Sequence, residues 1–394
     1  MVVALAKFGN VEMVGKYSLA LAITAPIFMF TNLQLRTFQI ADVRNEFNFH
    51  TYFSLRIYSS LLGIFISLGV LLLGDYPRET GLTIFIIGVA KGIESVSDIL
   101  WGLQQKVERM DFIAKSMLLK GIVSVIGFTS AIYVTGSLIV GSLVLTLSGG
   151  LGLLLYDIPN MKVNGKEPAS VKISAVSGGQ DQIDPIMELI KKTLPLGAVL
   201  ALVSLNANIS RYFVEHYWGE GSLGIFSALL YFIIPGNLIM NSMGQSLSPQ
   251  MAKRMDERNI TRYRHHLKNI LFMGGTISLA ALFLSIFWGR ELLLVVYTWE
   301  YAPQHKLLIY IMGAAFFIYL STGLGYGMTA AGYFKSQIPL FAGLTILTTA
   351  ANYIFVPRLG IGGAVISLFM SGFAQVFGSV WILRKVICTG RRSL

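Results

Sequence analysis

Residues 14–21 read Val14-Gly15-Lys16-Tyr17-Ser18-Leu19-Ala20-Leu21, and a related stretch, Leu223-Gly224-Ile225-Phe226-Ser227-Ala228-Leu229-Leu230, follows 209 residues later. Both stretches open apolar segments that are long enough to cross a membrane. Five identities recur at this offset: Gly15 and Gly224, Ser18 and Ser227, Leu21 and Leu230, Pro26 and Pro235, and Asn32 and Asn241. The repeat predicts a duplicated helical bundle, and duplicated membrane bundles usually enclose a transport path.

The composition places the chain in a membrane. Hydrophobic residues make up 54% of it and charged residues 13%, and the mean hydropathy is +0.65. A soluble domain carries about 25% charged residues, so this chain has too little polar surface to coat itself in water. The one cysteine, Cys388, excludes a disulfide framework and a metal site built from several cysteines.

Eleven apolar segments are long enough to span a bilayer core about 30 Å thick, which requires about 20 residues of helix. They are residues 17–38, 57–74, 80–103, 112–134, 137–157, 190–212, 222–246, 267–288, 306–333, 338–356 and 361–386. The runs are too long for membrane strands and lack the alternation of a membrane barrel. The sequence therefore predicts an all-α polytopic membrane protein.

The repeat also predicts that the first helix is truncated. In the second copy, the span 190–212 precedes the repeated stretch, and its counterpart in the first copy would begin before Met1. We therefore expect residues 1–6 to be the end of a helix whose opening turns are absent. The alternative is that residues 1–8 form a short arm. They do not resemble a signal peptide, which needs a basic segment followed by an apolar one.

Basic residues predict the orientation of the spans. When the loop after span 17–38 is placed inside and the others alternate, 23 of the 31 Lys and Arg residues fall on the inner side, Arg56 and Lys120 among them, and seven fall outside. Such a bias orients the protein with its C-terminus in the cytoplasm. The formal charge of +11 thus reflects membrane orientation, and we expect no nucleic-acid partner.

The longest polar stretch separates two halves. Residues 158–189 are rich in turn formers and charges, which is typical of a linker. We therefore predict an N-terminal bundle over residues 1–157, a cytoplasmic linker over 158–189, and a C-terminal bundle over 190–394. Six helices per half is an even number, so the two halves have the same orientation and form parallel repeats around a central cavity.

Three ionisable residues within the span 80–103 are the sharpest candidates for a site. Lys91, Glu94 and Asp98 lie three and four residues apart, on one face of a helix. Charges inside a bilayer are costly and usually serve a function. Lys91 is placed to pair with Glu94, while Glu94 and Asp98 repel each other and could share a proton. The alternative is a structural ion pair between helices.

Further polar residues near span ends join these candidates for a substrate cavity. Arg36, close to Asn32, is able to bind phosphate through a bidentate contact or to reach lipid head groups, and the same two readings hold for Arg211. Asn241 repeats Asn32 in the second half. Three prolines within spans are candidate hinges, because proline kinks a helix: Pro26, Pro195 and Pro235.

One glycine-rich run has no nucleotide-binding context. Gly323-Leu324-Gly325-Tyr326-Gly327 lies within a span and lacks the strand that a dinucleotide-binding fingerprint needs. Small residues in such a position favour close helix packing. We find no nucleophile triad, phosphate-binding loop or metal-ligand cluster in the sequence, and we expect neither an enzyme nor a cofactor.

The motifs resemble those of a known transporter family. Gly15-Lys16-Tyr17-Ser18-Leu19-Ala20 with Asn32-Leu33-Gln34-Leu35-Arg36 is similar to the opening of the bacterial polysaccharide flippases, which transport O-antigen and capsule repeat units. So are Arg211-Tyr212-Phe213-Val214-Glu215, Gln245-Ser246-Leu247-Ser248-Pro249 and Leu359-Gly360-Ile361-Gly362-Gly363-Ala364. The resemblance covers essentially the whole chain. These proteins belong to the multidrug/oligosaccharidyl-lipid/polysaccharide exporter superfamily.

The resemblance implies two six-helix bundles around a cavity that opens alternately to either side of the cytoplasmic (inner) membrane. The implied substrate is a short glycan on a polyprenyl pyrophosphate carrier, and membrane lipids and a polysaccharide polymerase are the implied partners. An ion gradient is one source of driving force for such movement. Charge in the cavity, at Arg36, Lys91 and Arg211, suits the pyrophosphate.

Two other functions stay open at this point. A drug or cation antiporter of the same superfamily would depend on Glu94 and Asp98 rather than on the cations. A membrane glycan polymerase or ligase would need a large outer loop with catalytic groups, whereas the longest predicted outer loop, residues 289–305, has about seventeen residues.

Overall fold

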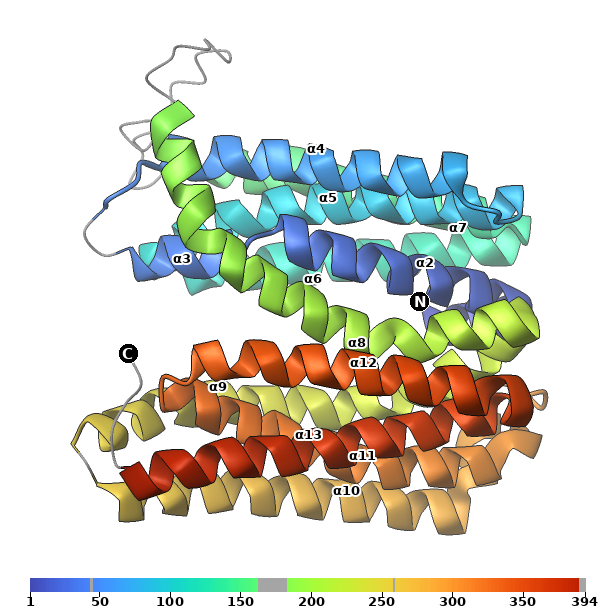
Figure 1. Cartoon of the computed structure of the whole chain (residues 1–394). Helices are drawn as coiled ribbons and strands as arrows, with labels where there is room; N and C mark the ends of the chain where they lie inside the picture. Colours follow the sequence, from blue (N-terminus) through green and yellow to red (C-terminus); the bar gives the residue numbers. More distant parts are fainter. Residues whose placement is uncertain (43–44, 162–182, 258, 390–394) are drawn as a thin grey trace. The chain divides into compact units, whose positions relative to one another are not determined.

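The computed structural model describes residues 1–42, 45–161, 183–257 and 259–389. Within those residues the chain is helical and contains no strand, as the sequence predicts. It divides into two compact units, Met1–Leu205 and Asn206–Leu394, and the division falls within one long helix (Figure 1). Most of the predicted linker 158–189 lies outside the described residues.

The first unit is a bundle of long helices with short connections. Its elements are α1 (Val2–Phe8), α2 (Val11–Thr31), α3 (Leu35–Ala41), α4 (Phe49–Leu73), α5 (Arg78–Lys106), α6 (Met110–Thr135), α7 (Leu138–Gly152), the π-helical turn η1 (Leu153–Asp157), the short η2 (Pro159–Met161), and the first part of α8 (Ile183–Leu230). Helix α5 packs against α2, α4 and α7, and it is the central helix of this unit.

The second unit begins in α8 and is likewise helical. It continues through η4 (Tyr231–Ile233), α9 (Ile234–Asp256), α10 (Ile260–Val296), η5 (Ala302–Gln304), α11 (His305–Ala330), α12 (Phe334–Leu359) and α13 (Ile361–Thr389). Helix α11 packs against α9, α10 and α13. The predicted close packing of small residues is present: a Cβ on Gly323 would lie 2.7 Å from Ile270 of α10, so α10 and α11 approach closely there.

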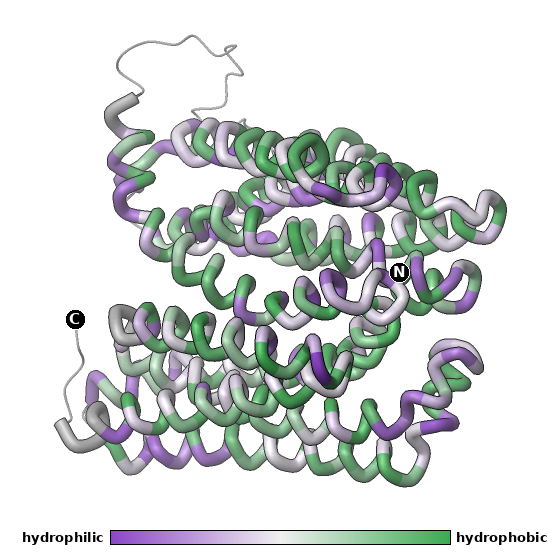
Figure 2. The backbone as a smooth tube through the Cα atoms, turned by 45° about the vertical axis from the view of Figure 1, so that its right-hand side comes forward, coloured by the Kyte–Doolittle hydropathy of each residue, from purple (hydrophilic) through white to green (hydrophobic). Residues whose placement is uncertain are grey.

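The eleven predicted spans are accounted for by these helices. By length and composition, nine described segments qualify as membrane spans, and one of them, Pro185–Asp256, contains both predicted spans 190–212 and 222–246. Helix α5 is not among these nine, yet it is a continuous helix over the predicted span 80–103. In Figure 2 the helices of each unit are largely hydrophobic along their length.

The positions at which helices break also recur 209 residues apart. In the first unit, α1 and α2 are separated at Gly9 and Asn10. The counterpart of Asn10 is Gly219, where φ is +76° and ψ is 178°, which breaks α8. This combination is accessible to glycine and almost to no other residue. The duplication is therefore visible in backbone geometry as well as in sequence.

Residues 1–8 form a short helix that packs against the bundle. Helix α1 contacts α2 and α6, and it buries Val2, Leu5 and Ala6. These residues thus behave as a helix of the bundle and not as an exposed arm.

The outward faces of the helices are apolar, as a lipid environment requires. On α6, Leu118, Ile122 and Ile126 recur every four residues, and each is at least 58% exposed. In water, the hydrophobic effect would favour burial of such a stripe. The stripe fits contact with lipid chains, which satisfy apolar side chains without protein neighbours.

The structure adds two details to the predicted topology. The predicted outer loop 289–305 is mostly helical, because α10 continues to Val296 and η5 begins at Ala302. Arg56 and Lys120, assigned to the inner side with the loop cations, lie within α4 and α6 and are buried or nearly so.

Candidate functional site

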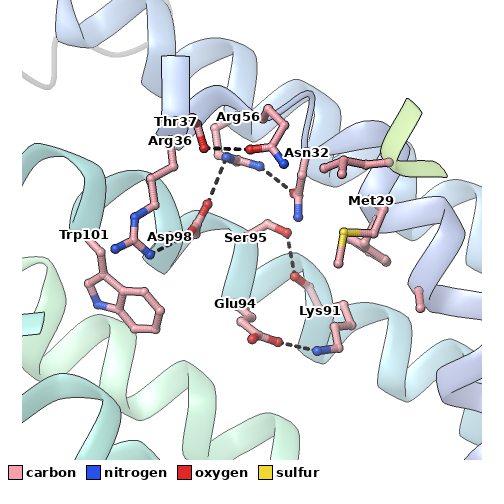
Figure 3. Close-up of a pocket in the computed structure, with 14 residues that line it drawn as sticks. Met29, Asn32, Arg36, Thr37, Arg56, Lys91, Glu94, Ser95, Asp98 and Trp101 are labelled. Atoms are coloured by element: carbon pink, nitrogen blue, oxygen red, sulfur yellow. Dashed lines mark hydrogen bonds and ion pairs between the residues drawn. The ribbon is translucent and has the colours of Figure 1, made fainter. Parts of the chain in front are cut away.

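A polar cavity of about 320 Å³ lies within the first unit. Its walls come from α2, the turn after it, α3, α4, α5 and the first part of α8 (Figure 3). Five of the predicted site residues line it together: Asn32, Arg36, Lys91, Glu94 and Asp98. Residues that are up to 66 positions apart in sequence thus meet in one place.

A left-handed turn directs Asn32 and Arg36 into this cavity. Helix α2 ends at Thr31, and α3 begins at Leu35. Between them Leu33 and Gln34 have φ angles of +50° and +53°. Such angles are uncommon for residues other than glycine, and they cluster at functional positions. The turn reverses the chain tightly, so that the residues on either side of it face the same cavity.

Three hydrogen bonds fasten the Arg36 guanidinium to α5. Its Nη1 donates to Asp98 Oδ1 at 3.1 Å, and its Nε and Nη2 donate to Gln105 Oε1 at 3.2 and 2.8 Å. The guanidinium also lies 5.9 Å from the centre of the Trp101 ring, within cation–π range. Because a guanidinium carries five N–H groups, two remain for a ligand beyond the bonds among described residues.

Arg56 completes the site, although it was not among the site residues predicted from the sequence. It is fully buried in α4, donates from Nη1 to Asn32 Oδ1 at 2.5 Å, and donates from Nη2 to Asp98 Oδ2 at 3.3 Å. Its position one residue before the predicted span 57–74 made it look like a loop cation. The signal that identifies it is its place on an apolar helix opposite the acidic residues of α5.

The Asp98 carboxylate is shared by two arginines. One oxygen binds Arg36 and the other binds Arg56. As the spacing predicts, Lys91 Nζ pairs with Glu94 Oε2, at 2.6 Å. Each carboxylate therefore has its own cationic partner, and the expectation that Glu94 and Asp98 share a proton is not supported. Three cations and two carboxylates leave the cavity with a net positive charge.

Arg211 and Asn241 do not line this cavity and belong to the second unit. Arg211 Nη1 donates to Asn208 Oδ1 at 2.7 Å, on its own helix. Asn241 Oδ1 accepts from the Tyr326 hydroxyl at 3.3 Å. Their assignment to the substrate path stays a prediction.

The three candidate hinge prolines lie in helices or at a helix start. Pro26 is inside α2 and Pro195 is inside α8. Pro235 stands in the first turn of α9, directly after the 3-10 turn η4, where a proline needs no hydrogen-bond donor. Bending at these positions stays a prediction.

Metal-ligating groups are not clustered in the described part of the chain. No three His, Cys, Asp or Glu side chains come together there in a way that could hold a metal ion. What the cavity offers instead is a set of hydrogen-bond donors with a positive charge, which is the chemistry that recognises an anion.

Solved structures of transporters share this fold. An inward-facing multidrug resistance MATE family transporter of the MOP superfamily aligns with a TM-score of 0.79 at 14% identity, over 99% of this chain and 93% of that one. The lipid II flippase MurJ, in its inward closed conformation, aligns with a TM-score of 0.75 at 13% identity, over 99% and 86%. These likenesses establish the fold, a multi-pass membrane bundle.

Sequence comparisons place the chain in a family. It is 25% identical over 381 residues to the capsular polysaccharide biosynthesis protein CapF of Staphylococcus aureus, covering 96% of this chain and 93% of CapF. A second family model, MatE, matches residues 195–340. The model of the polysaccharide biosynthesis proteins matches residues 1–255, most of the chain, and the chain belongs to this family.

Proposed function

We propose that this protein is a flippase that moves lipid-linked oligosaccharide repeat units across the cytoplasmic membrane for the synthesis of a surface polysaccharide. The substrate would be a short glycan on a polyprenyl pyrophosphate carrier. Membership of the polysaccharide biosynthesis family and the fold shared with a lipid II flippase support transport of such a substrate. The protein would act as a transporter and not as an enzyme.

The main support for this proposal is that hydrogen bonds hold the Arg36 guanidinium at the wall of a cavity inside a membrane bundle. A planar guanidinium binds two phosphate oxygens at once, and holding it in place beforehand lowers the cost of binding. Lys91 adds a second cation at the same cavity. Pyrophosphate thus meets a positive, pre-positioned site, while the lipid tail stays in the bilayer.

The cavity lies near the helix ends that the charge bias assigns to the cytoplasm. Arg36 follows the end of α2, and Arg56 lies in the second turn of α4. A substrate would therefore load from the cytoplasmic side, and the C-terminus would also be cytoplasmic. Release outside would follow from rocking of the two bundles, with Pro26, Pro195 and Pro235 as bending points.

The remaining elements of the proposal concern driving force and partners. An ion gradient would drive the movement, and no coupling ion is assigned. The flippase would hand its product to a polysaccharide polymerase, and membrane lipids would surround the apolar outer stripe that includes Leu118 and Ile122 of α6.

The test is complementation of a bacterial strain that lacks its own repeat-unit flippase. Expression of this chain is expected to restore the surface polysaccharide, and Arg36→Ala is expected to abolish the restoration. Arg109→Ala is the matched control, because Arg109 is an exposed arginine that pairs with nearby Asp111 and does not line the cavity. Full polysaccharide in the Arg36→Ala strain, at unchanged membrane abundance, would contradict the role of the cavity.

The same strains test the antiporter alternative. Export of a cationic drug needs acidic groups that face the cavity without cationic partners, but Asp98 is held between Arg36 and Arg56, and Glu94 binds Lys91. We therefore expect drug sensitivity to be unchanged by Glu94→Gln. A change in drug sensitivity without a change in polysaccharide would favour the antiporter.

A further inference from the structure

A second polar cluster lies inside the first unit, among α5, α6 and the π-helical turn η1. Lys120 of α6 pairs with Asp157 of η1, and its Nζ also donates to Ser97 Oγ at 2.6 Å. The Ser116 hydroxyl donates to Asp157 Oδ1 at 2.5 Å. The side chains of Lys120 and Asp157 are 14% and 2% exposed. A charge pair at this depth is costly and calls for a reason.

The backbone is shaped to bring this pair together. Asp157 ends a π-helical turn, a rare form that is frequent at functional sites. The aliphatic stem of Lys120 passes over Gly152, where any Cβ would overlap its Cγ. No larger residue at position 152 leaves that path open. The end of α7, at Gly152, and η1 thus leave space for the Lys120 side chain.

The cluster holds the indole of Trp101. The Trp101 Nε1–H points to Ser116 Oγ at 3.2 Å and to Asp157 Oδ1 at 3.4 Å. Lys120 Nζ lies 5.2 Å from the centre of the same ring, and Arg36 lies 5.9 Å from it. One indole is therefore close to both the cation of the cluster and the cation of the polar cavity (Figure 3 shows Trp101 beside Arg36).

Trp101 lines two cavities, as Lys91 and Glu94 also do. It lines the polar cavity of Arg36 and a neighbouring cavity of about 420 Å³ that contains Lys120. An indole has two rotatable side-chain bonds, so the contacts around it select its rotamer. Here hydrogen bonds at Nε1 and two cations at the ring fix its position.

We propose that Trp101 is a positioning residue for Arg36, anchored by the Lys120–Asp157 pair. The pair and Ser116 hold the indole, and the indole lies 5.9 Å from the guanidinium, which Asp98 and Gln105 of the same helix also bind. This inference deepens the proposed function and rests on it for the ligand, a phosphate group of the lipid carrier. It gives the buried ion pair a role that simple helix packing does not require.

The test measures how accessible Arg36 is, with and without ligand. The protein is purified in lipid nanodiscs and treated with the arginine reagent phenylglyoxal, and modification of Arg36 is followed by mass spectrometry. Exposed Arg109 serves as the internal standard. The variants are Trp101→Leu, which removes the ring, Trp101→Phe, which keeps a ring without its N–H, and Asp157→Asn, which uncouples Lys120.

Trp218→Phe is the matched control, because it removes an indole N–H bond, to Val356 O at 2.9 Å, in the second unit. We expect Arg36 in Trp101→Leu to react about three- to tenfold faster than in the wild type, and Trp101→Phe and Asp157→Asn to fall between. Trp218→Phe is expected to match the wild type. Equal Arg36 rates in the wild type and Trp101→Leu would overturn the positioning role.

Addition of a polyprenyl diphosphate separates this inference from the proposed function. Protection of Arg36 in the wild type, and weaker protection in Trp101→Phe, supports both. A wild-type Arg36 that is not protected, but whose basal rate still depends on Trp101, contradicts the proposed ligand and leaves the positioning role standing. If Asp157→Asn alone behaves as the wild type, the anchoring part of the inference is wrong.

Discussion

Arg56 of α4 and Asp98 of α5 join two membrane helices through a contact of 3.3 Å, from Nη2 to Oδ2. The arginine is fully buried, and Asp98 is the carboxylate that neutralises it. The second oxygen of Asp98 binds Arg36, so one carboxylate orders both arginines. The Asp98 carboxylate therefore holds both arginines of the candidate anion site in place and also lowers the positive charge of that site.

Asp98→Asn is expected to destabilise the protein strongly. Removal of the carboxylate charge leaves Arg56 buried without a counter-charge, and breaking such a pair costs about 3–5 kcal/mol. Thermal unfolding of the purified protein is the measurement. Glu94→Gln is the control, because Glu94 is 58% exposed and pairs only with Lys91 among the described residues. Similar midpoints for both variants would show that Asp98 does not stabilise Arg56.

Arg36→Lys is expected to lose most of the transport activity although the charge is retained. A lysine ammonium is a point charge that cannot bind Asp98 and Gln105 at the same time in the guanidinium geometry. We expect a loss of surface polysaccharide of about tenfold or more, since each lost charged hydrogen bond contributes about 1.5–3 kcal/mol. Quantification of the polysaccharide in the complemented strain is the measurement, and Arg109→Lys is its control.

Near-normal export by Arg36→Lys would show that charge alone is sufficient. In that case the bonds between Arg36 and Gln105 would not contribute to function, and Lys91 would be the better candidate for the phosphate contact. The Arg36→Gln variant then decides the matter, because it keeps hydrogen-bond donors and loses the charge.

Helix content and the α5 cluster were predictable because both follow from local pattern. Apolar runs of about 20 residues specify membrane helices, and charges three and four positions apart share a helix face. Lys91, Glu94 and Asp98 met both conditions. The repeat predicted a duplicated bundle, and the structure adds that the helix breaks at Asn10 and Gly219 lie at the same offset.

Arg56, Trp101 and the Lys120–Asp157 pair were not predictable in the same way. Their contacts with Asp98 and Asp157 join residues 37 to 56 positions apart, and no local pattern encodes which faces of two helices meet. Lys120 did carry a local signal, a charge within an apolar span. That signal was outweighed by counting it with the loop cations, although a charge in a span needs a buried partner.

Gly219→Ala is expected to lower stability. Its backbone, with φ +76° and ψ 178°, is accessible to glycine almost alone, and such strain costs about 1–3 kcal/mol for other residues. A Cβ there meets no atom within 4 Å, so the effect would be conformational and not steric. Gly221→Ala is the control, because this glycine is helical and equally open, and alanine favours a helix by about 1 kcal/mol. Thermal unfolding that ranks Gly219→Ala at or above Gly221→Ala would contradict the assigned break.

Asp42 is expected to make the stability of the first unit depend on pH below about pH 4. This residue follows α3 and lies outside the spans. Burial raises the pKa of its carboxyl, but hydrogen bonds from the N–H groups of Glu46 and Phe47 and from the Tyr52 hydroxyl, together with the charge of Lys106, lower the pKa by more than burial raises it. The net pKa of Asp42 therefore lies below its ordinary value. A carboxyl with a depressed pKa in the folded state stabilises that state above its unfolded pKa, about 3.9. The stabilisation is lost as the pH falls through the folded value.

The measurement is the difference in unfolding midpoint between the wild type and Asp42→Asn, from pH 7 to pH 3. We expect the wild type to be the more stable above about pH 4 and the difference to shrink steadily at lower pH, because protonation turns Asp42 into a neutral group like the asparagine. Asp75→Asn is the control, since Asp75 lies in an exposed connection between α4 and α5. A difference that does not change with pH would show that Asp42 stabilises the fold through the geometry of its hydrogen bonds and not through its charge.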